Sequence, residues 1–376
     1  MRKHYDVIII GGGVIGSSIA YFLRRHTPYN VLVLERNKIG SEASSAAAGM
    51  LGAQAEIHEA GPLYEMARQS RQLFPELSYE LKEISGVDME WVDKGLFKTA
   101  KDSCEAERLQ DLAAFHRANG QPAEWMDVDE LCKKEPNASA ELAGALFLPK
   151  DGQVNAPKLT QAYAQAAVKL GADFMEYTEA AGFDFAQLGT GVQTSAGTFY
   201  GEKLVLASGV WTGRLAAQTG LHMPVFPVKG ECLSLNFMEP VITSSIISKD
   251  CYLVPKQGGR LVIGATMRTG TYDRKVTAEA VGQLLEGAIK VVPGIRNGEW
   301  EKAWSGFRPQ TPDGLPYMGK HPNHSNIYFA AGHFRNGILL SPITGQWITE
   351  LVCGRKEEQS LNEFAPERFV LEQMKG

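Results

Sequence analysis

The sequence predicts a two-domain α/β (α+β) chain that combines a Rossmann-like domain with a discontinuous, strand-rich second domain. Its first 35 residues follow the order strand, glycine-rich turn, helix, strand and acid, which is typical of a dinucleotide-binding unit. Apolar strands that end in small residues recur at 203–209 and 327–332. The intervening segments 86–149 and 223–305 are rich in strands. A chain of 376 residues is long enough for about two domains.

The N-terminal unit contains a G-x-G-x-x-G motif between the apolar segments 7–10 and 31–34. Gly11 allows the tight turn, Gly13 lets the backbone approach a pyrophosphate, and Gly16 lets the helix pack closely on the strand. The N-terminus of that helix attracts phosphate through its free N–H groups. Glu35, nineteen residues after Gly16, is placed to accept hydrogen bonds from a ribose. A glycine turn without a ligand is the alternative, and the motif leaves NAD and FAD open as cofactors.

The remaining elements follow from hydrophobic periodicity and turn residues. We expect helices at 60–86, 104–118, 127–134, 157–170, 277–292 and 341–353. We expect strands at 90–92, 95–99, 171–176, 225–235, 243–255 and 260–266, and a hairpin over 182–200. Residues 41–56 are small and flexible, which favours either close approach to a ligand or an alanine-rich helix start.

The placement of these signatures predicts the domain boundaries. We expect an FAD- or NAD-binding domain made of residues 1–85, 150–222 and 306–376, because the dinucleotide signatures fall at the start, middle and end of the chain. Residues 86–149 and 223–305 carry strands without such signatures, and we expect them to form the substrate-binding domain.

Composition argues against several kinds of partner and site. The net charge of −5 gives no electrostatic reason to expect nucleic acid or an anionic membrane as a partner. The five cysteines are odd in number and lack C-x-x-C spacing, which indicates a reducing compartment and no disulfide framework. The histidines lack metal-ligand spacing, so we expect no metal. The first apolar segment is only four residues long and indicates no signal peptide, so we expect a cytoplasmic protein.

A second signal lies in residues 329–345, which predict a strand, a glycine-containing loop and a helix. A helix N-terminus stabilises the negative charge that a reduced flavin carries, so this segment favours a flavin, although an ordinary glycine turn is the alternative. Arg308 and Arg335 are candidates to bind a substrate carboxylate, or are surface or ion-paired arginines. Tyr252 is a candidate active-site residue or a core tyrosine.

Several longer segments resemble the D-amino-acid oxidase-like flavoenzymes and, within that family, the bacillus-type glycine oxidases of thiamine biosynthesis. The segments that carry this resemblance are 45–53, 207–211, 227–234, 264–267 and 330–339. The resemblance covers nearly the whole chain. It implies a Rossmann-like FAD-binding domain with non-covalent FAD and a strand-rich substrate-binding domain.

The resemblance also implies an activity. Glycine, sarcosine and small D-amino acids would be oxidised to an imine by hydride transfer to flavin N5, and O2 would be reduced to H2O2. The imine of glycine would hydrolyse to glyoxylate and ammonia, or pass to thiazole synthase for the thiamine thiazole. A homotetramer is the assembly that the family suggests.

Site residues follow from matching positions. The resemblance assigns Arg308 to the substrate carboxylate, Tyr252 and Met267 to the active-site pocket, and Arg335 to contacts with flavin and substrate. Asp250 stands where the family leads us to expect a histidine, which would alter the charge of the pocket. The positions expected to contact FAD are Gly11, Gly13, Val14, Ile15, Gly16, Glu35, Arg36, Ala43, Ser44, Ser45, Ala48, Gly49, Met50, Ala180, Ser208, Gly209, His333, Phe334, Arg335, Asn336, Gly337, Ile338 and Leu339.

The sequence leaves three alternatives open: a sarcosine oxidase, a D-amino-acid dehydrogenase with an acceptor other than oxygen, and a non-catalytic flavin-binding protein. Covalent sarcosine oxidases attach flavin through a late cysteine, and this chain has none between Cys251 and Cys353.

Overall fold

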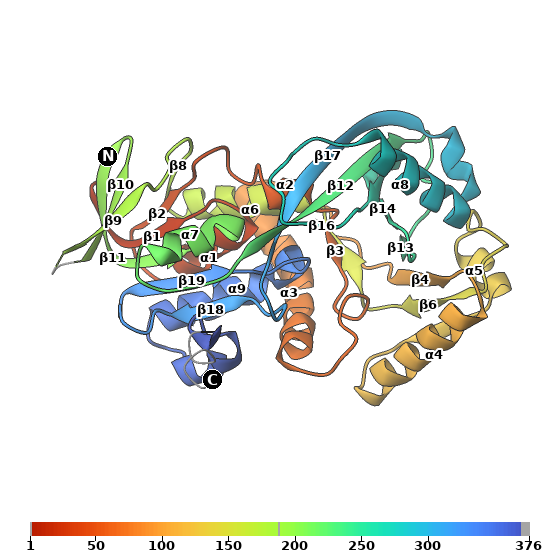
Figure 1. Ribbon diagram of the computed structural model, residues 1–376, viewed down its shortest axis with the longest axis horizontal. Coiled ribbons are helices and arrows are strands. Elements are labelled where there is room, and N and C mark those ends of the chain that lie inside the picture. Colours follow the sequence, from red (N-terminus) through yellow and green to blue (C-terminus); the bar gives the residue numbers. More distant parts are fainter. Residues whose placement is uncertain (1, 187–188, 370–376) are drawn as a thin grey trace.

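The computed structural model describes residues 2–186 and 189–369, and its main feature is a pair of large β-sheets that lie side by side (Figure 1). The first sheet has the strand order β18-β19-β11-β1-β2-β8, and β10 and β9 extend it from β11. Its strands are β1 (His4–Ile10), β2 (Val31–Leu34), β8 (Asp173–Met175), β9 (Gly182–Ala186), β10 (Gly189–Thr194), β11 (Gly197–Leu206), β18 (Tyr317–Lys320) and β19 (Ile327–Ala331). Strand β1 pairs in parallel with β2 and β11, as expected for a Rossmann-like sheet.

Both faces of this first sheet are covered, which explains why its central strands are apolar throughout. Alternate residues such as Val7 and Ile9 pack on one face against helices, and Ile8 and Ile10 pack on the other. The helices on the first face are α1 (Val14–His26), α3 (Pro62–Ser85), α6 (Ala156–Lys169) and α9 (Gly337–Val352), and α7 (Thr212–Ala217) packs on the other face.

Helices α1 and α9 approach one another closely. The side chain of Ser18 donates a hydrogen bond of 2.7 Å to the carbonyl of Ser341, and a Cβ atom at Gly345 would collide with the Ser18 hydroxyl. This contact fixes the two helices relative to each other, and the residues at both N-termini line the same cavity described below.

The second sheet has the order β16-β12-β15-β14-β13-β4-β6-β5, with β17 paired to β12. Its strands are β4 (Leu96–Ala100), β5 (Glu124–Met126), β6 (Gly144–Leu148), β12 (Phe226–Asn236), β13 (Ser245–Ile247), β14 (Tyr252–Pro255), β15 (Arg260–Gly264), β16 (Arg268–Thr269) and β17 (Glu299–Gln310). The helices α4 (Ser103–Ala118), α5 (Val128–Lys134) and α8 (Ala278–Val291) pack on it. The long strands β12 and β17 reach from this sheet toward the first one (Figure 1).

Short elements complete the chain between and around the sheets. Strands β3 (Met50–Leu51) and β7 (Gly152–Gln153) form a separate two-stranded pair, and α2 (Ala43–Ala46) is a single helical turn. Short 3-10 segments lie at Gly209–Trp211, Gln257–Gly259, Pro293–Asn297 and Glu358–Phe364.

Three sequence expectations differ from the structure. Residues 90–92 form no strand, because Glu90 adopts a φ of 54° and only Val92 makes an isolated bridge, to Gln153. The expected strand at 243–255 is two strands, β13 and β14, separated by a turn in which Ser248 accepts a hydrogen bond from the N–H of Cys251. The last helix begins at Gly337 and not at 341, where a Ser-Pro pair resembles a helix start.

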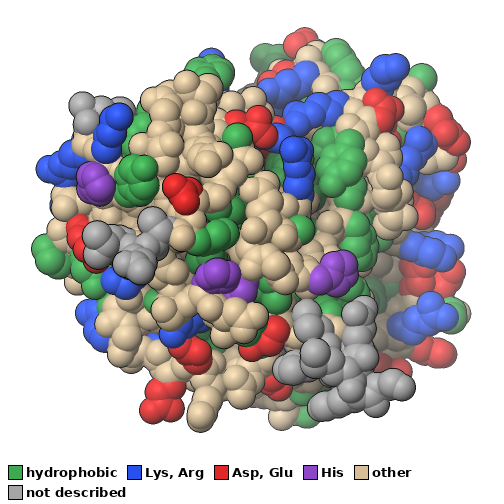
Figure 2. Space-filling model, turned by 60° about the vertical axis from the view of Figure 1, so that its left-hand side comes forward, with side chains coloured by type: hydrophobic (Ala, Val, Ile, Leu, Met, Phe, Trp, Pro, Cys, Tyr) green, Lys and Arg blue, Asp and Glu red, His purple; other side chains and the backbone are tan. Residues whose placement is uncertain are grey.

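Side chains of both charge signs alternate over the face of the molecule shown in Figure 2. Among the described residues, no helix is both long and apolar enough to cross a membrane.

Candidate active site

A cavity of about 370 Å³ lies where the two sheets meet. On one side, its walls come from the carboxyl ends of the first sheet's strands, through Ile10, Leu34, Ala207 and Ala331. Strands β12, β14 and β17 of the second sheet supply the opposite wall. The carboxyl edge of a parallel sheet is the usual place for a ligand in this class of fold.

At one end of this cavity, the glycine-rich turn is held by a buried carboxylate. Glu35 accepts hydrogen bonds of 2.8 Å from the N–H groups of Gly12 and Asn37, one at each carboxylate oxygen. Gly11 has a φ of 110°, and a Cβ atom there would lie 2.5 Å from the carbonyl oxygen of Ala207. Because a carboxylate has about four acceptor positions, Glu35 retains capacity for ribose hydroxyls while it fixes the turn.

Two helix N-termini open into the cavity. Gly13 and Val14 begin α1, and the N–H of Val14 donates 2.9 Å to the Ser44 hydroxyl. Gly337 and Ile338 begin α9 and line the same cavity. Helix N-termini attract negative charge, so one of them suits a pyrophosphate and the other an anionic flavin edge. This arrangement, with its glycine cradle, fits an FAD molecule.

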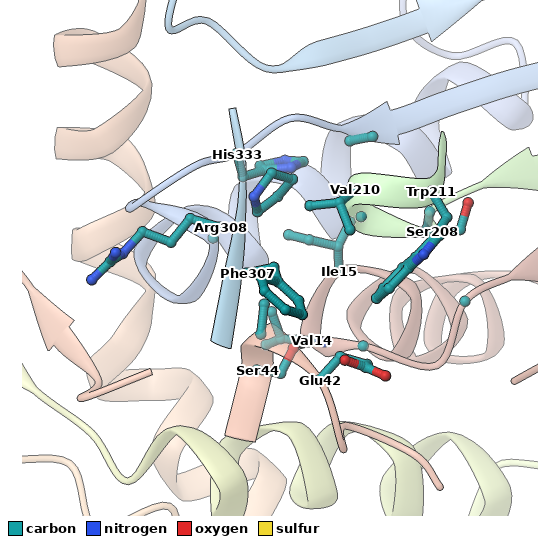
Figure 3. Close-up of a pocket in the computed structure, with 18 of the residues that line it drawn as sticks. Val14, Ile15, Glu42, Ser44, Ser208, Val210, Trp211, Phe307, Arg308 and His333 are labelled. Atoms are coloured by element: carbon teal, nitrogen blue, oxygen red, sulfur yellow. Dashed lines mark hydrogen bonds between the residues drawn. The ribbon is translucent and has the colours of Figure 1, made fainter. Parts of the chain in front are cut away.

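A cluster of aromatic and charged side chains borders the end of the cavity at which Glu35 lies. The guanidinium of Arg36 stacks 3.6 Å from the ring centre of Trp211 and lies 3.2 Å from the carboxylate of Glu42. Glu42 also pairs with Arg274 from the second sheet's side of the molecule, at 2.7 Å. Figure 3 shows Trp211 and Ser208 on one side of the pocket and Arg308 on the other.

Arg308 projects from β17 into the opposite end of the cavity. Its Nη1 atom donates a hydrogen bond of 3.2 Å to the carbonyl of Thr266. Gly230, across the sheet on β12, leaves the space that the guanidinium occupies, since a Cβ atom there would collide with it. Arg308 therefore presents a fixed cation toward the cavity, with donors suited to a carboxylate.

Tyr252 on β14 lies beside Cys232, with 3.4 Å between the hydroxyl oxygen and the sulfur. Burial raises the pKa of the Tyr252 hydroxyl well above its usual value of 10, so this group stays protonated across the physiological range. Burial also raises the pKa of the Cys232 thiol. Both groups line the cavity as neutral hydrogen-bonding side chains.

The loop before α9 completes the end of the cavity at which Arg308 and Tyr252 lie. His333 is buried and contacts the hydroxyl of Thr344 at 3.0 Å, and burial lowers the pKa of His333 to about 3, so its ring is neutral. The N–H of Phe334 donates 2.9 Å to the carbonyl of Pro309, which ties the loop to β17. Arg335 pairs with Glu56 at 2.8 Å and reaches the Met267 sulfur at 3.6 Å.

Most of the residues expected to contact the cofactor or substrate line this one cavity. The lining includes Gly11, Gly13, Val14, Ile15, Glu35, Arg36, Ala43, Ser44, Ala48, Gly49, Met50, Ala180, Ser208, Gly209, Tyr252, Arg308, His333, Phe334, Arg335, Asn336, Gly337 and Ile338. These residues come from seven separate stretches of the chain, between Gly11 and Ile338.

The other predicted positions lie outside the cavity lining. Gly16 lies within α1, where a Cβ atom would collide with the carbonyl oxygen of Gly11. Ser45 faces a neighbouring cavity, and Leu339 is buried in the core. Met267 is exposed and touches the site through Arg335. Asp250 is exposed beside Gly287 of α8, away from the cavity lining.

Several lining residues were not identified from the sequence, among them Glu42, Glu56, Trp211, Cys232 and Phe307. Glu42 and Glu56 both lie within the small-residue segment 41–56, so the expected approach of this segment to a ligand could have identified them. Cys232 and Phe307 lie inside strands, where the register decides which side chains face the cavity, and no local pattern indicates that choice.

In the described part of the chain, no group of three His, Cys, Asp or Glu side chains is arranged to hold a metal ion. All five cysteines are free thiols.

Comparison with known proteins relates this site to a family. Residues 6–351 match the family described as FAD dependent oxidoreductase. The glycine oxidase of Geobacillus kaustophilus (strain HTA426) is 47% identical over 376 residues, which cover 98% of each chain. The crystal structure of glycine oxidase from Geobacillus kaustophilus superimposes with a TM-score of 0.95 at 46% identity, covering 98% of this chain and 99% of that one. The bifunctional protein ThiO/ThiG of Synechocystis is 34% identical over 98% of this chain and 55% of its own length.

Proposed function

The chain belongs to the family of FAD-dependent oxidoreductases, and we propose that it oxidises glycine, with sarcosine and small D-amino acids as further substrates. Its high identity to glycine oxidases over nearly the full length supports this activity. The observation that carries the proposal is the position of Arg308, a fixed cation at one end of a cavity whose other end fits FAD.

The proposed site assigns a task to each end of the cavity. FAD would bind non-covalently along the residues that the sequence singles out, with Glu35 at the ribose and the N-terminus of α1 at the pyrophosphate. We assign cofactor binding to residues 1–85, 150–222 and 306–376, and substrate binding to residues 86–149 and 223–305. Strand β17 runs across the boundary at 305–306, so it links the two proposed domains.

At the substrate end, Arg308 would hold the carboxylate of glycine through paired N–H donors, and Arg335 would add a second cation at the rim. FAD bound in this cavity would supply a two-electron acceptor for the hydride from the substrate Cα, with O2 as the final acceptor and H2O2 as its product. The substrate becomes an imine, which water converts to glyoxylate and ammonia.

Among the described residues that line this end of the cavity, we assign none as a strong base, and none is required. Tyr252 stays protonated and His333 stays neutral, so neither carries a charge that opposes the reaction. A neutral substrate amine can lose a hydride directly once its Cα–H is aligned, and alignment is the task of Arg308 and Tyr252.

Anaerobic mixing of the holoenzyme with glycine, sarcosine or D-alanine tests this proposal. Each substrate should bleach the visible flavin absorbance, and admission of O2 should restore it and release H2O2. Bleaching followed by slow reoxidation would instead indicate a dehydrogenase with another acceptor. No bleaching with any of the three would indicate a non-catalytic flavin protein.

Acid precipitation should release the flavin into the supernatant, because attachment is non-covalent. The fusion of ThiO to ThiG in a relative supports transfer of the imine to a thiazole synthase. A homotetramer is the assembly suggested by the resemblance. The five free thiols support a reducing, cytoplasmic location.

A further inference from the structure

A second cavity, of about 340 Å³, lies directly beside the first. Glu42 and residues 46–48 and 306–307 line both cavities, so a wall of small residues, one phenylalanine and one carboxylate separates them. A volume of this size is within the range of small-molecule sites.

The lining of the second cavity is strongly cationic. Lys256, Arg260, Arg274 and Lys302 line it, against a single carboxylate, that of Glu42. The N-terminus of the fourteen-residue helix α6 also opens here, through Asn155 and its neighbours, and adds positive potential.

The two arginines are already neutralised, whereas the two lysines are not. Arg274 pairs with Glu42 at 2.7 Å, and Arg260 pairs with Glu301 at 2.5 Å. Throughout residues 2–186 and 189–369, no carboxylate oxygen lies within 4.0 Å of the Lys256 or Lys302 ammonium group.

The ammonium of Lys256 contacts only neutral acceptors on the protein. It donates 2.6 Å to the Gln153 side chain and 2.8 Å to the carbonyl of Val154. Desolvation by burial lowers the pKa of Lys256 to about 7, while the charge of Glu90 raises it and that of Arg260 lowers it. Lys302 contacts the ring of Trp304, at 5.7 Å from its centre.

We propose that the second cavity binds a small phosphate-bearing molecule, with the phosphate between Lys256 and Lys302 and within reach of the two arginines. Two unmatched ammonium groups suit a dianion better than a single carboxylate. The proposal does not depend on which amine the first cavity oxidises.

An occupant of this cavity would act on the cofactor site through the shared wall. Trp304 donates a hydrogen bond of 3.0 Å from its indole to the carbonyl of Ala46, and Gly306 packs against the Ala46 side chain. Ala46 ends α2, whose Ser44 contacts the start of α1 at the proposed pyrophosphate position. Phosphate binding therefore stabilises α2 and changes the surroundings of the flavin.

The test titrates the FAD-loaded holoenzyme with inorganic phosphate, with sodium chloride at equal ionic strength as the reference. We expect a saturable rise in the unfolding temperature and a saturable change in the flavin absorbance spectrum. Lys302→Ala, at an exposed position, should weaken the phosphate response at least about tenfold. Lys256→Met should weaken it further, and Lys290→Ala, an exposed lysine on α8, should leave it unchanged.

Further titrations with other anions identify the class of ligand. A phosphomonoester such as glycerol phosphate that saturates at lower concentration than free phosphate indicates an organic phosphate, and the reverse order indicates phosphate itself. An equal response to acetate or chloride would overturn the proposal. So would a response that persists in both lysine variants, because phosphate would then be bound elsewhere, for example at Arg308 in competition with glycine.

Discussion

The two ends of the large cavity are built in different ways. The nucleotide end is built around backbone groups and small residues between Ile10 and Met50, with Glu35 fixing the turn, and residues of 178–181 and 207–218 complete it. The substrate end consists of side chains that four distant segments deliver, including Arg308 on β17 and Tyr252 on β14. Backbone groups cannot rotate away from an added atom, so mutations at the nucleotide end should disturb folding and FAD binding. The substrate end depends on where individual side chains lie, so mutations there should change substrate binding.

The largest effect is expected at the nucleotide end, from Gly16→Ala. The added Cβ meets the carbonyl oxygen of Gly11, which is backbone and cannot rotate away. The turn and α1 must separate, so we expect loss of bound FAD and a loss of more than about 4 kcal/mol in the free energy of unfolding. Flavin content after purification and urea unfolding measure these two quantities.

The matched control for that change is Gly282→Ala in α8, where a Cβ atom meets nothing within 4 Å. It should leave FAD content unchanged and alter stability by less than about 1 kcal/mol. A Gly16→Ala protein that keeps its FAD and its stability would show that the close contact is not needed.

The next largest effect is expected at the substrate end, from Arg308→Ala. Removal of the proposed carboxylate partner should lower kcat/KM for glycine by roughly a hundredfold, or about 3 kcal/mol, with FAD content intact. Arg308→Lys should recover only part of the loss, because an ammonium lacks the paired donors. Steady-state kinetics of both variants measure this, with the exposed Arg296→Ala as a control. Unchanged kinetics in Arg308→Ala would remove this residue from substrate binding.

A smaller effect should follow from Gly230→Ala, which leaves Arg308 in the chain but takes its space. The added Cβ collides with the end of a flexible side chain and not with backbone, so the protein should fold and bind FAD. The guanidinium must move, and we expect KM for glycine to rise about tenfold, which corresponds to about 1.4 kcal/mol. If KM stays at the wild-type value while Arg308→Ala is impaired, the position of the guanidinium is less restricted than the structure indicates.

The smallest effect concerns pH and lies at His333, in the loop before α9. Because the pKa of this histidine is lowered in the folded protein, the unfolded chain binds more protons as pH falls below about 6.5. Stability from this group is therefore present at higher pH and is lost as pH falls toward 3. From about pH 7.5 to pH 6, His333→Gln should lose roughly 1 kcal/mol less than the wild type.

Unfolding of the holoenzyme at several pH values measures that slope. Thr344→Val removes the partner of His333 and keeps the histidine, so it should retain the wild-type slope. Equal slopes in His333→Gln and wild type would mean that the buried ring does not contribute to the pH dependence.

The sequence predicted the nucleotide end of the cavity better than the parts of the structure that distant segments form. The N-terminal dinucleotide unit was predictable because strand, turn and helix obey local rules, and the parallel pairing of β1 with β2 follows from them. The break between β13 and β14 and the start of α9 at Gly337 were missed, because a side-chain turn and an internal Pro342 override the local pattern. The sequence did not indicate that Gly230 and Gly306 make close contacts, because the side chains that they approach, Arg308 and Ala46, are distant in the sequence.

The sequence by itself determined the two-domain α/β class, the glycine cradle and the identity of the candidate arginines, because each depends on residue type and short spacing. Only the tertiary structure decided that Cys232 and Phe307 face the cavity and that Met267 reaches the site through Arg335. It also placed Lys256 and Lys302 around a second cavity behind the wall of the first. Side-chain direction and the meeting of distant strands depend on sheet register and domain packing, which no local segment encodes.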